Sequence, residues 1–183
     1  MSTLTDHNRL ATFVPESSVP GLEPSTFREF FRHHALGVAV VTADAGDGPV
    51  AMTVTSLSSI SAEPPLFIFS ASAFSSSSDT IRSAKSIVVH LLDQDERWLA
   101  KLASTSGADR FSVPWHPLPT GEPVYSGIKA WMRGEIVATV DAGASTVIVA
   151  QAVESSAPPA EAHVPLVYHN RIWHAISENS RLD

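Results

Sequence analysis

The hydrophobic positions along the chain change their period after the first few dozen residues. Phe27, Phe30 and Phe31 recur at the spacing of an amphipathic helix, and Thr26 with Glu29 fits a capping box at its start. Short β-branched runs separated by turn residues follow, a pattern that predicts strands. The predicted strands cover residues 37–43, 50–61, 66–72, 86–92, 129–143 and 145–155, with a closing hairpin around Asn170 and Arg171.

Helices are few in this pattern. Short ones are predicted only around residues 80–84 and around Trp98. Since helices do not alternate with strands, a doubly wound parallel sheet is disfavoured. A mainly β fold, a small antiparallel barrel that is closed to remove exposed sheet edges, fits better. This domain is expected over residues 25–177, between a flexible N-terminal tail (1–24) and a short C-terminal tail (178–183).

Composition narrows the classes of partner. The chain has 183 residues, of which 44% are hydrophobic and 17% charged, enough to form a real core. The formal net charge of -7, without any run of lysine or arginine, disfavours nucleic acid and anionic membranes as partners. The absence of cysteine excludes disulfides and thiolate chemistry. No signal-peptide pattern or long apolar stretch is visible, so we expect a cytoplasmic protein.

The eight histidines do not suggest a metal site. His33 and His34 are adjacent on the predicted helix and therefore do not share a face. His163, His169 and His174 lie near one another in the sequence but lack the carboxylate partners that a hard metal ion prefers. The glycine-rich dinucleotide motif, the P-loop and the nucleophile elbow are also missing. We therefore expect neither a metal ion nor a Rossmann-type nucleotide site.

Two hydroxyl-rich segments are the candidate binding surfaces. The strand M-T-V-T-S-L-S-S-I-S (52–61) offers neutral donors and backbone amides, which suit a flat polar heterocycle such as an isoalloxazine. The segment S-A-F-S-S-S-S-D-T-I (72–81) places serines where a helix begins, which favours an anion without needing lysine. Each segment alone is also typical of a half-solvated strand or an ordinary helix cap. Their order and spacing together favour a flavin site.

With these segments, the chain resembles the short-chain flavin reductase family. The resemblance implies the fold of that family, a six-stranded antiparallel FMN-binding split β-barrel of Greek-key type. The resemblance runs from about Phe27 to Ile176. Its motifs are specific in combination rather than singly. They are ALGVAVVTA (35–43), AMTVTSLSSISAEPPL (51–66), SSSSDTIRSAKSIVVHLL (75–92), ERWLAKLAS (96–104), DRF (109–111), LPTGEPVYSG (118–127) and PLVYHNRIWHAI (165–176).

The resemblance implies roles for particular residues. In the family, the hydroxyl-rich strand holds the isoalloxazine and ribityl chain, and the serine-rich helix start takes the phosphate. The positions that match are Thr53, Val54, Thr55 and Ser56 for the ring, Ser58 for the ribityl chain, and Ser76 and Ser78 for the phosphate. His90 stands where the family often has asparagine, and is either a flavin contact or an ordinary barrel residue. Ser145, Trp173 and His174 are candidates for the nicotinamide rim, although hairpin packing also explains the last two.

The resemblance also implies an activity. It is the NAD(P)H-dependent reduction of FMN or FAD, with reduced flavin passing to a partner monooxygenase. Hydride transfer to a bound flavin requires little acid–base chemistry from the protein, so we assign no catalytic residue. The choices between FMN and FAD, and between NADH and NADPH, stay open. The family is usually homodimeric, and the apolar runs at 136–140 and 147–150 suit a covered face.

Two departures from the family pattern leave alternatives open. Gly143-Ala144-Ser145 stands where the family has G-D-H, so both the acid and the imidazole of that turn are missing. Met132-Arg133-Gly134 stands in place of the family's L-E-C. The changed turn favours an alternative function, a flavin carrier, store or sensor without turnover. A relative that binds haem or a deazaflavin on the same barrel is a further alternative.

Overall fold

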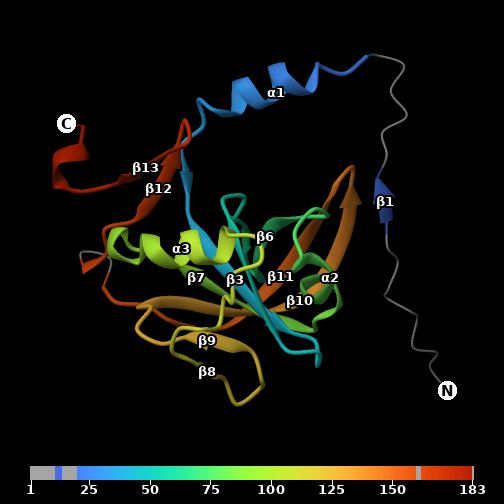
Figure 1. Ribbon diagram of the computed structural model, residues 1–183, viewed down its shortest axis with the longest axis vertical. Helices are drawn as coiled ribbons and strands as arrows, with labels where there is room; N and C mark the ends of the chain where they lie inside the picture. The colour runs from blue at the N-terminus through green and yellow to red at the C-terminus, as the bar shows by residue number, and fades with distance from the viewer. Residues whose placement is uncertain (1–10, 14–19, 160–161, 183) are drawn as a thin grey trace.

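The computed structural model describes residues 11–13, 20–159 and 162–182, and most of its regular structure is β (Figure 1). The helices are α1 (Pro24–Phe31), α2 (Ser78–Ser83) and α3 (Arg97–Ser104), with single 3₁₀ turns at Gln94–Glu96 and Glu178–Ser180. The strands are β1 (Ala11–Phe13), β2 (Leu36–Gly37), β3 (Ala39–Asp44), β4 (Pro49–Val54), β5 (Ser58–Ala62), β6 (Pro65–Ser72), β7 (Ser86–Leu91), β8 (Trp115–Pro117), β9 (Pro123–Tyr125), β10 (Ala130–Ala142), β11 (Ser145–Ser156), β12 (Leu166–His169) and β13 (Ile172–Ala175).

The main sheet is antiparallel along its path β4-β3-β7-β10-β11-β6-β5, which confirms the predicted fold class. It curls until its two ends meet, where the backbone amide of Ser70 on β6 donates to Oγ of Ser56, just past β4, at 2.8 Å. β5 is an addition to the six expected strands. It arises because the predicted strand 50–61 is interrupted at residues 55–57 and continues beside β6 instead of β3.

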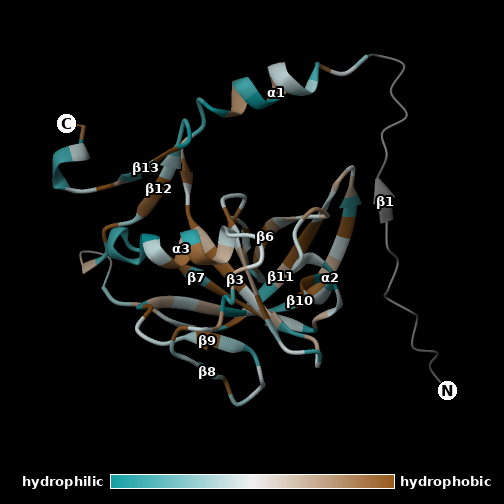
Figure 2. Cartoon of the chain, in the orientation of Figure 1, coloured by the Kyte–Doolittle hydropathy of each residue, from teal (hydrophilic) through white to brown (hydrophobic). Residues whose placement is uncertain are grey.

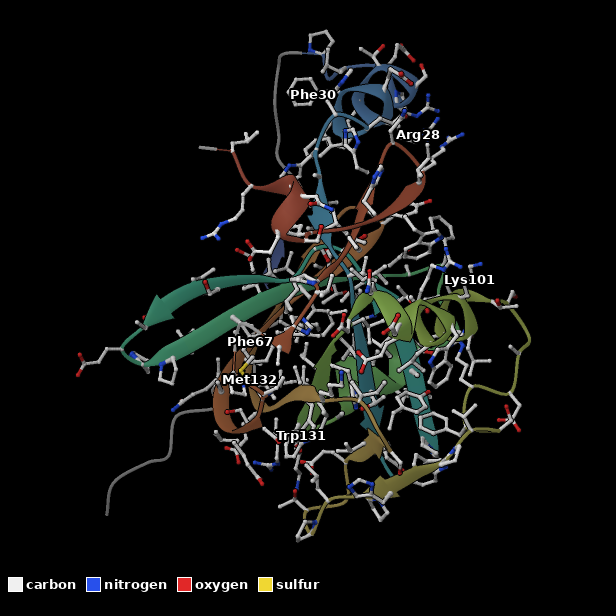
Figure 3. The ribbon with its side chains drawn as sticks, turned by 90° about the vertical axis from the view of Figure 1, so that its left-hand side faces the viewer. Arg28, Phe30, Phe67, Lys101, Trp131 and Met132 are labelled. Carbon is white, nitrogen blue, oxygen red and sulfur yellow. The ribbon has the colours of Figure 1, made fainter. Side chains whose placement is uncertain are left out.

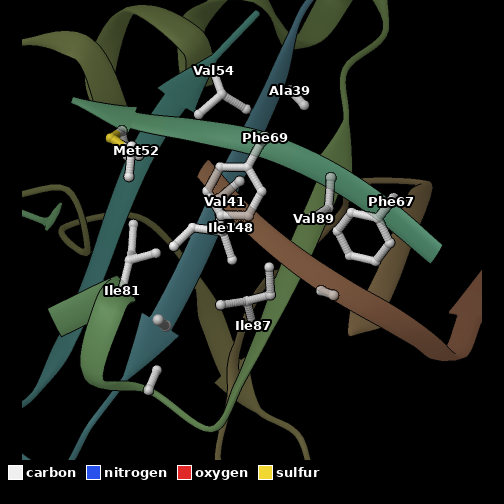
Figure 4. Packing of buried hydrophobic residues seen from close by; sticks show 14 residues of the cluster. Ala39, Val41, Met52, Val54, Phe67, Phe69, Ile81, Ile87, Val89 and Ile148 are labelled. Atoms are coloured by element: carbon white, nitrogen blue, oxygen red, sulfur yellow. The ribbon is translucent and has the colours of Figure 1, made fainter. Parts of the chain in front are cut away.

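The barrel interior is filled by the inward-facing side chains of the strands. Phe67 and Phe69 of β6 pack with Ile148 of β11 and with Ile87 of β7 (Figure 4). Helix α2 contributes Ile81, which is fully buried in the same cluster. Burying each such side chain is worth about 1.5–3 kcal/mol, so this cluster is the main source of the barrel's stability.

A second apolar layer lies outside β3 and β4. Leu99 and Ala100 of α3 pack against Val40 and Ala51, the outward positions of those two strands. Figure 2 shows the apolar residues gathered on the central strands and on α3, with polar residues at the periphery. Tyr125 is 1% exposed in the same cluster, so the segment 105–127 is packed onto the barrel. That segment contains the short ladder of β8 and β9.

The two predicted hairpins are confirmed. Gly143 adopts a positive φ of 60° in the turn between β10 and β11. Asn170 and Arg171 have φ values of 47° and 64° between β12 and β13. Consecutive positive φ angles produce the turn whose twist matches two antiparallel strands.

Helix α1 stands apart from the barrel, and the predicted capping box of Thr26 and Glu29 is wrong. The helix begins earlier, at Pro24, with Glu23 in the cap position. Proline is tolerated there because the first helical N–H has no partner within the helix. No residue of α1 is buried, and Figure 3 places Phe30 clear of the strands.

The terminal segments differ in part from the expected tails. Within the predicted N-terminal tail, residues 11–13 form β1, which pairs parallel with the end of β10, so this stretch belongs to the sheet. Residues 1–10 and 14–19 of that tail lie outside the described residues. The predicted C-terminal tail includes the 3₁₀ turn at Glu178–Ser180. Within the described ranges, no helix combines the length and apolarity that crossing a membrane would need.

Candidate functional site

A half-buried polar face lies on the outside of the barrel, where β6 and β11 run side by side. Burial alternates along both strands, so Ser70 and Ser72 of β6 point outward while their neighbours point into the core. Ser145 of β11 is paired with Ser72 and also lies on the outer face. Farther along, the same face becomes apolar with Ile68 and Val147. Hydroxyls and apolar positions are therefore contiguous.

The end of β4 supplies further hydroxyls to the same region, but the four residues predicted at the ring behave differently. Thr53 donates its hydroxyl to the carbonyl of Ala100 on α3 at 2.7 Å, so its hydroxyl already has a partner. The side chain of Val54 lies in the core, which leaves only its backbone for a ligand. Thr55 is half-buried, with no hydrogen-bond partner for its hydroxyl among the described residues. Ser56 is exposed and accepts the amide hydrogen bond that joins β4 to β6.

Ser58 lies one step farther along the chain, on β5. It is exposed, and its hydroxyl donates to the carbonyl of Ser59 at 3.3 Å. We define the hydroxyl face as Thr55, Ser56, Ser70, Ser72 and Ser145. Ser58 borders this face on the β5 hairpin.

The serine run before α2 is mostly occupied with internal hydrogen bonds. The buried Ser78 donates to the carbonyl of Ser72, which ties α2 to β6. The buried Ser77 donates to the carbonyl of Ala51 on β4 at 2.8 Å. Ser76 is exposed, so of the two serines predicted to bind phosphate only Ser76 has a side chain open to a ligand.

The guanidinium of Arg110 contacts the serine run, where the sequence did not predict a cation. Nη1 of Arg110 donates to the carbonyl of Ala51 at 2.7 Å and to Oγ of Ser77. A cavity of about 290 Å³ opens beside these groups. It is lined by Pro49, Val50, Ser76, Ser77, Gly107, Ala108, Asp109, Arg110 and Phe111. The serine run thus borders a cavity with a guanidinium at its wall.

His90 is an internal residue of the barrel, which favours its interpretation as an ordinary barrel residue over a flavin contact. Its side chain is fully buried, its Nδ1 donates to the carbonyl of Val40 at 3.2 Å, and its Nε2 accepts from the amide of Tyr125 at 3.2 Å. Burial lowers the pKa of His90 to about 4, against a smaller opposing effect of the Val40 hydrogen bond. The ring is therefore neutral at pH 7 and both nitrogens are satisfied.

The three candidates for the nicotinamide rim do not come together within one chain. Ser145 lies beside Ser72, and the backbone amide of Ala73 donates to the carbonyl of Ala144 at 3.0 Å, so the turn touches the serine run. Trp173 and His174 lie on β13, on the opposite side of the molecule (Figure 1).

Trp173 packs against Tyr168 with ring centroids 4.7 Å apart, as the packing explanation of the final hairpin expects. Trp173 and His174 line a separate cavity of about 290 Å³ with Arg97. Neither residue contributes to the hydroxyl face of its own chain.

A cavity of about 820 Å³ elsewhere on the barrel shares no residue with the hydroxyl face. Buried Glu122 in its wall accepts hydrogen bonds from Ser86, Thr120 and Arg133. Burial alone would raise the pKa of Glu122, but these hydrogen bonds outweigh it and hold the pKa below its usual range. Within the described part of the chain, no group of three potential metal ligands gathers anywhere.

Comparison with known proteins places the chain in a family. The model of the flavin reductase like domain matches residues 31–177. The chain belongs to this family. The NADH:FMN oxidoreductase of Rhodococcus qingshengii is 38% identical over 160 residues, which cover 85% of this chain and 83% of that protein. The reductase subunit HsaB of a flavin-dependent monooxygenase of Mycobacterium tuberculosis is 29% identical over 150 residues, or 81% of this chain and 80% of that protein.

A solved structure agrees with the assignment to the flavin reductase family. The flavin reductase domain protein from Arthrobacter sp. FB24 matches with a TM-score of 0.79 and 32% sequence identity. The match covers 87% of this chain and 97% of that one. It extends over nearly the whole barrel.

Three residues around the site of this flavin reductase were not among the site residues predicted from the sequence. Ser70 and Ser72 sit at alternate positions of a strand whose other positions are Phe67, Phe69 and Ala71, so strict alternation was the signal that could have found them. Arg110 lies in the DRF motif, more than thirty positions beyond the serine run. Only the packing of residues 105–127 brings it there.

Proposed function

We propose that this chain is an NADH-dependent flavin reductase that binds FMN at its hydroxyl face. The observation that supports this proposal is that Thr55, Ser56, Ser70, Ser72 and Ser145 come together from β6, β11 and the turn after β4, in a chain of the flavin reductase family. A relative named as an NADH:FMN oxidoreductase supports NADH as the hydride donor and FMN as the flavin.

The chain's own residues position the reactants in this reaction. A bound flavin supplies the hydride chemistry itself, so the protein needs no catalytic acid or base. The free hydroxyl of Thr55 and the exposed Ser56 offer neutral hydrogen bonds to the polar edge of a flat ring. Ile68 and Val147, on the apolar part of the face, exclude water from the ring. Ser145, at the start of β11 next to the turn from β10, contacts the nicotinamide at the rim of the flavin site.

The reduced flavin is the product, and its consumer is a flavin-dependent monooxygenase. The reductase subunit HsaB supports this, because its name states that role. We place the reaction in the cytoplasm, where NADH is available.

A test of flavin release places cytochrome c behind a dialysis membrane that retains the protein. Reduction of that cytochrome c in the presence of NADH and FMN is expected, and its absence would contradict release.

The chain forms a homodimer in this proposal. Two surfaces support it: the aromatic face of α1, which has no buried residue, and the half-buried valines Val147 and Val149 on the outside of β11. The rim residues Trp173 and His174 lie far from the hydroxyl face of their own chain (Figure 1). Only a second copy brings such residues to the site.

The deciding experiment is an anaerobic titration of the FMN-loaded protein with NADH and then with NADPH. We expect the flavin absorption to bleach with NADH at a rate that supports turnover. Because Gly143, Ala144 and Ser145 lack the acid and imidazole of the family's turn, a carrier or store is the second candidate function. Tight FMN binding without bleaching would select that candidate, and failure to bind FMN would overturn both.

A matched pair of substitutions tests whether the hydroxyl face holds the flavin. Thr55→Val removes a hydroxyl that has no partner among the described residues, and we expect FMN affinity to fall about tenfold with little change in stability. Thr53→Val removes the hydrogen bond to Ala100, and we expect about 1 kcal/mol lower stability with FMN affinity retained. Fluorescence titration measures the FMN affinity and thermal unfolding the stability. An FMN affinity that falls in Thr53→Val but not in Thr55→Val would mean that the flavin binds elsewhere.

A further inference from the structure

We propose that Phe74 packs against the nicotinamide ring of NADH and sets the affinity of this chain for its hydride donor. The inference rests on the proposed function and deepens it, because it adds an apolar group that holds the dinucleotide beside the flavin. It is carried by the rigid turn below the ring, by the exposure of the ring, by its position next to Ser145 and by the chemistry of the nicotinamide.

Phe74 occupies a central position of the turn that joins β6 to α2. The backbone amide of Ser75 donates to the carbonyl of Ser72 at 3.0 Å, which closes a four-residue turn with Ala73 and Phe74 at its centre. The amide of Phe74 donates to Oγ of Ser72 at 3.3 Å, and the hydroxyl of Ser78 donates to the carbonyl of Ser72. The backbone that carries the ring is therefore held in place, and a ligand that binds there loses little entropy in ordering it.

The side chain of Phe74 is unusually open for a residue of its kind. It is 88% exposed and belongs to none of the three apolar clusters in the described part of the chain. It also takes part in none of the aromatic pairs formed by the described residues. The central positions of turns are mostly glycine, proline or small polar residues. A phenyl ring at such a position has an apolar face available to a ligand.

The turn holds this ring beside the nicotinamide rim of its own chain. Ser72, the first residue of the turn, is paired with Ser145 across β6 and β11. The amide of Ala73 donates to the carbonyl of Ala144 at 3.0 Å, which joins this turn to the one between β10 and β11. Consecutive Cα atoms are about 3.8 Å apart, so Phe74 lies one residue from that contact. Its ring borders the place where Ser145 is proposed to contact the nicotinamide.

The neighbouring turn leaves room for a planar ligand. Gly143, Ala144 and Ser145 carry only a hydrogen atom, a methyl group and a hydroxymethyl group, so no bulky side chain of that turn competes for the space beside Phe74. The two rim candidates on β13 lie on the opposite side of the same chain (Figure 1). Phe74 therefore supplies an aromatic surface next to Ser145 without the help of a second copy.

Both forms of the nicotinamide suit a phenyl ring. NADH presents an uncharged ring with apolar faces, which gains from burial against an aromatic side chain. NAD⁺ presents a positively charged ring, which the negative face of the phenyl group also attracts. An aliphatic side chain offers the first interaction but not the second. This difference separates stacking on Phe74 from simple burial.

Steady-state kinetics at saturating FMN test the role of Phe74. The wild type is compared with Phe74→Ala, Phe74→Leu and Phe74→Tyr. We expect Phe74→Ala to raise both the KM for NADH and the inhibition constant of NAD⁺ about tenfold, with the Kd of FMN unchanged. Phe74→Leu should restore most of the KM for NADH but not the inhibition constant of NAD⁺, whereas Phe74→Tyr should restore both. Trp98→Ala removes a 45% exposed aromatic residue of α3 and should leave all three constants unchanged.

Light scattering distinguishes a contact with NADH from a contact with a second copy. Phe74→Ala should have the same mass in solution as the wild type. A smaller mass for Phe74→Ala, an unchanged KM for NADH, or a Kd of FMN that rises together with the KM would each overturn the inference. If the wild type binds FMN without turnover, the proposed reductase activity fails separately. The Kd of NAD⁺ for the FMN-loaded protein, read from the flavin absorption spectrum, then decides the inference, which equal values in the wild type and Phe74→Ala would overturn.

Discussion

His90 shows how a buried polar residue at the centre of the barrel acts on a surface site. Its imidazole joins Val40 of β3 to the amide of Tyr125, and Tyr125 in turn holds the carbonyl of Arg110. A neutral ring is required, because Nε2 must accept a hydrogen bond. Protonation would place an unpaired charge in the core. His90 thus links the packing of the core to the position of Arg110 beside the serine run.

The protonation of His90 predicts a loss of stability in acid. Its pKa is lowered from 6.5 to about 4 by burial, so the unfolded chain binds this proton at a higher pH than the folded chain does. The stabilisation is therefore complete above pH 6.5, is lost as the pH falls from 6.5 to 4, and amounts to about 3 kcal/mol. We expect the free energy of unfolding, measured with urea at stepped pH, to fall across this window.

Substitution isolates the contribution of this residue. His90→Gln should be less stable at pH 7, because it loses well-formed buried hydrogen bonds, but its stability should fall less steeply between pH 6.5 and 4. His33→Gln, at an exposed histidine, should keep the full slope. Equal slopes in His90→Gln and the wild type would show that His90 does not titrate in this way.

Residue types alone could not separate polar side chains used inside the fold from those left for a ligand. Thr53 lies on β4 and Thr55 directly after its end, yet Ala100 of α3 accepts the hydroxyl of Thr53 while the hydroxyl of Thr55 has no partner among the described residues. His90 carries no signal of burial beyond its apolar neighbours. Arg110 reaches the serine run only through long-range packing. The family pattern located the region of the site, while the partner of each hydroxyl depends on tertiary contacts.

At the scale of elements, the packing of Phe67 from β6 against β10 depends on a missing side chain. Gly134 is buried, and a Cβ atom placed there would lie 2.6 Å from Cζ of Phe67 and 3.2 Å from Cβ of Ala150. The pairing of β10 with β11 shifts register next to this residue. Figure 3 shows Phe67 close to Met132, which lies two residues before Gly134 on β10. The glycine that departs from the family's L-E-C therefore makes room for the phenylalanine ring.

This packing predicts that Gly134→Ala is destabilising. The added methyl group must displace the buried ring of Phe67, and such overpacking costs about 1–3 kcal/mol in the free energy of unfolding. Gly37→Ala is the matched control, because nothing lies within 4 Å of a Cβ atom at that exposed glycine. The double variant Gly134→Ala with Phe67→Leu should recover part of the loss. Urea unfolding of all the variants would refute the steric explanation if Gly134→Ala matched the control.

The elements themselves were largely predictable, since their signals are local. The period of the hydrophobic positions located the strands 66–72, 86–92 and the long hairpin, and turn residues located the last hairpin. The break of strand 50–61 at residues 55–57 was not predictable, because it occurs where the chain leaves β3 and joins β6. The β8–β9 ladder also escaped detection, since two strands of three residues have too short a pattern.

At the scale of the whole molecule, the apolar surface is unevenly covered. Phe27, Phe30 and Phe31 are 53%, 71% and 47% exposed, and form a cluster with centroid separations of 4.8 and 5.7 Å. A helix of eight residues is not stable in water on its own. Figure 3 shows that the barrel of the same chain does not cover Phe30. The helix therefore depends on another surface, and the proposed second copy of the chain supplies it.

Light scattering coupled to size exclusion tests this assignment. The wild type should elute at twice the chain mass of 19.5 kDa at micromolar concentration. Phe30→Glu places a charge in the aromatic cluster and forfeits about 1.5–3 kcal/mol of burial per chain, so it should shift the equilibrium toward the monomer. Trp98→Glu alters a 45% exposed aromatic residue on α3 and should remain dimeric.

A monomeric wild type would contradict the proposed dimer. A fully dimeric Phe30→Glu variant would show that the interface is not at α1 and would favour the outer face of β11 instead. In the proposed dimer, Trp173 and His174 of one copy lie at the hydroxyl face of the other, so the monomeric variant should also bind NADH more weakly than the wild type.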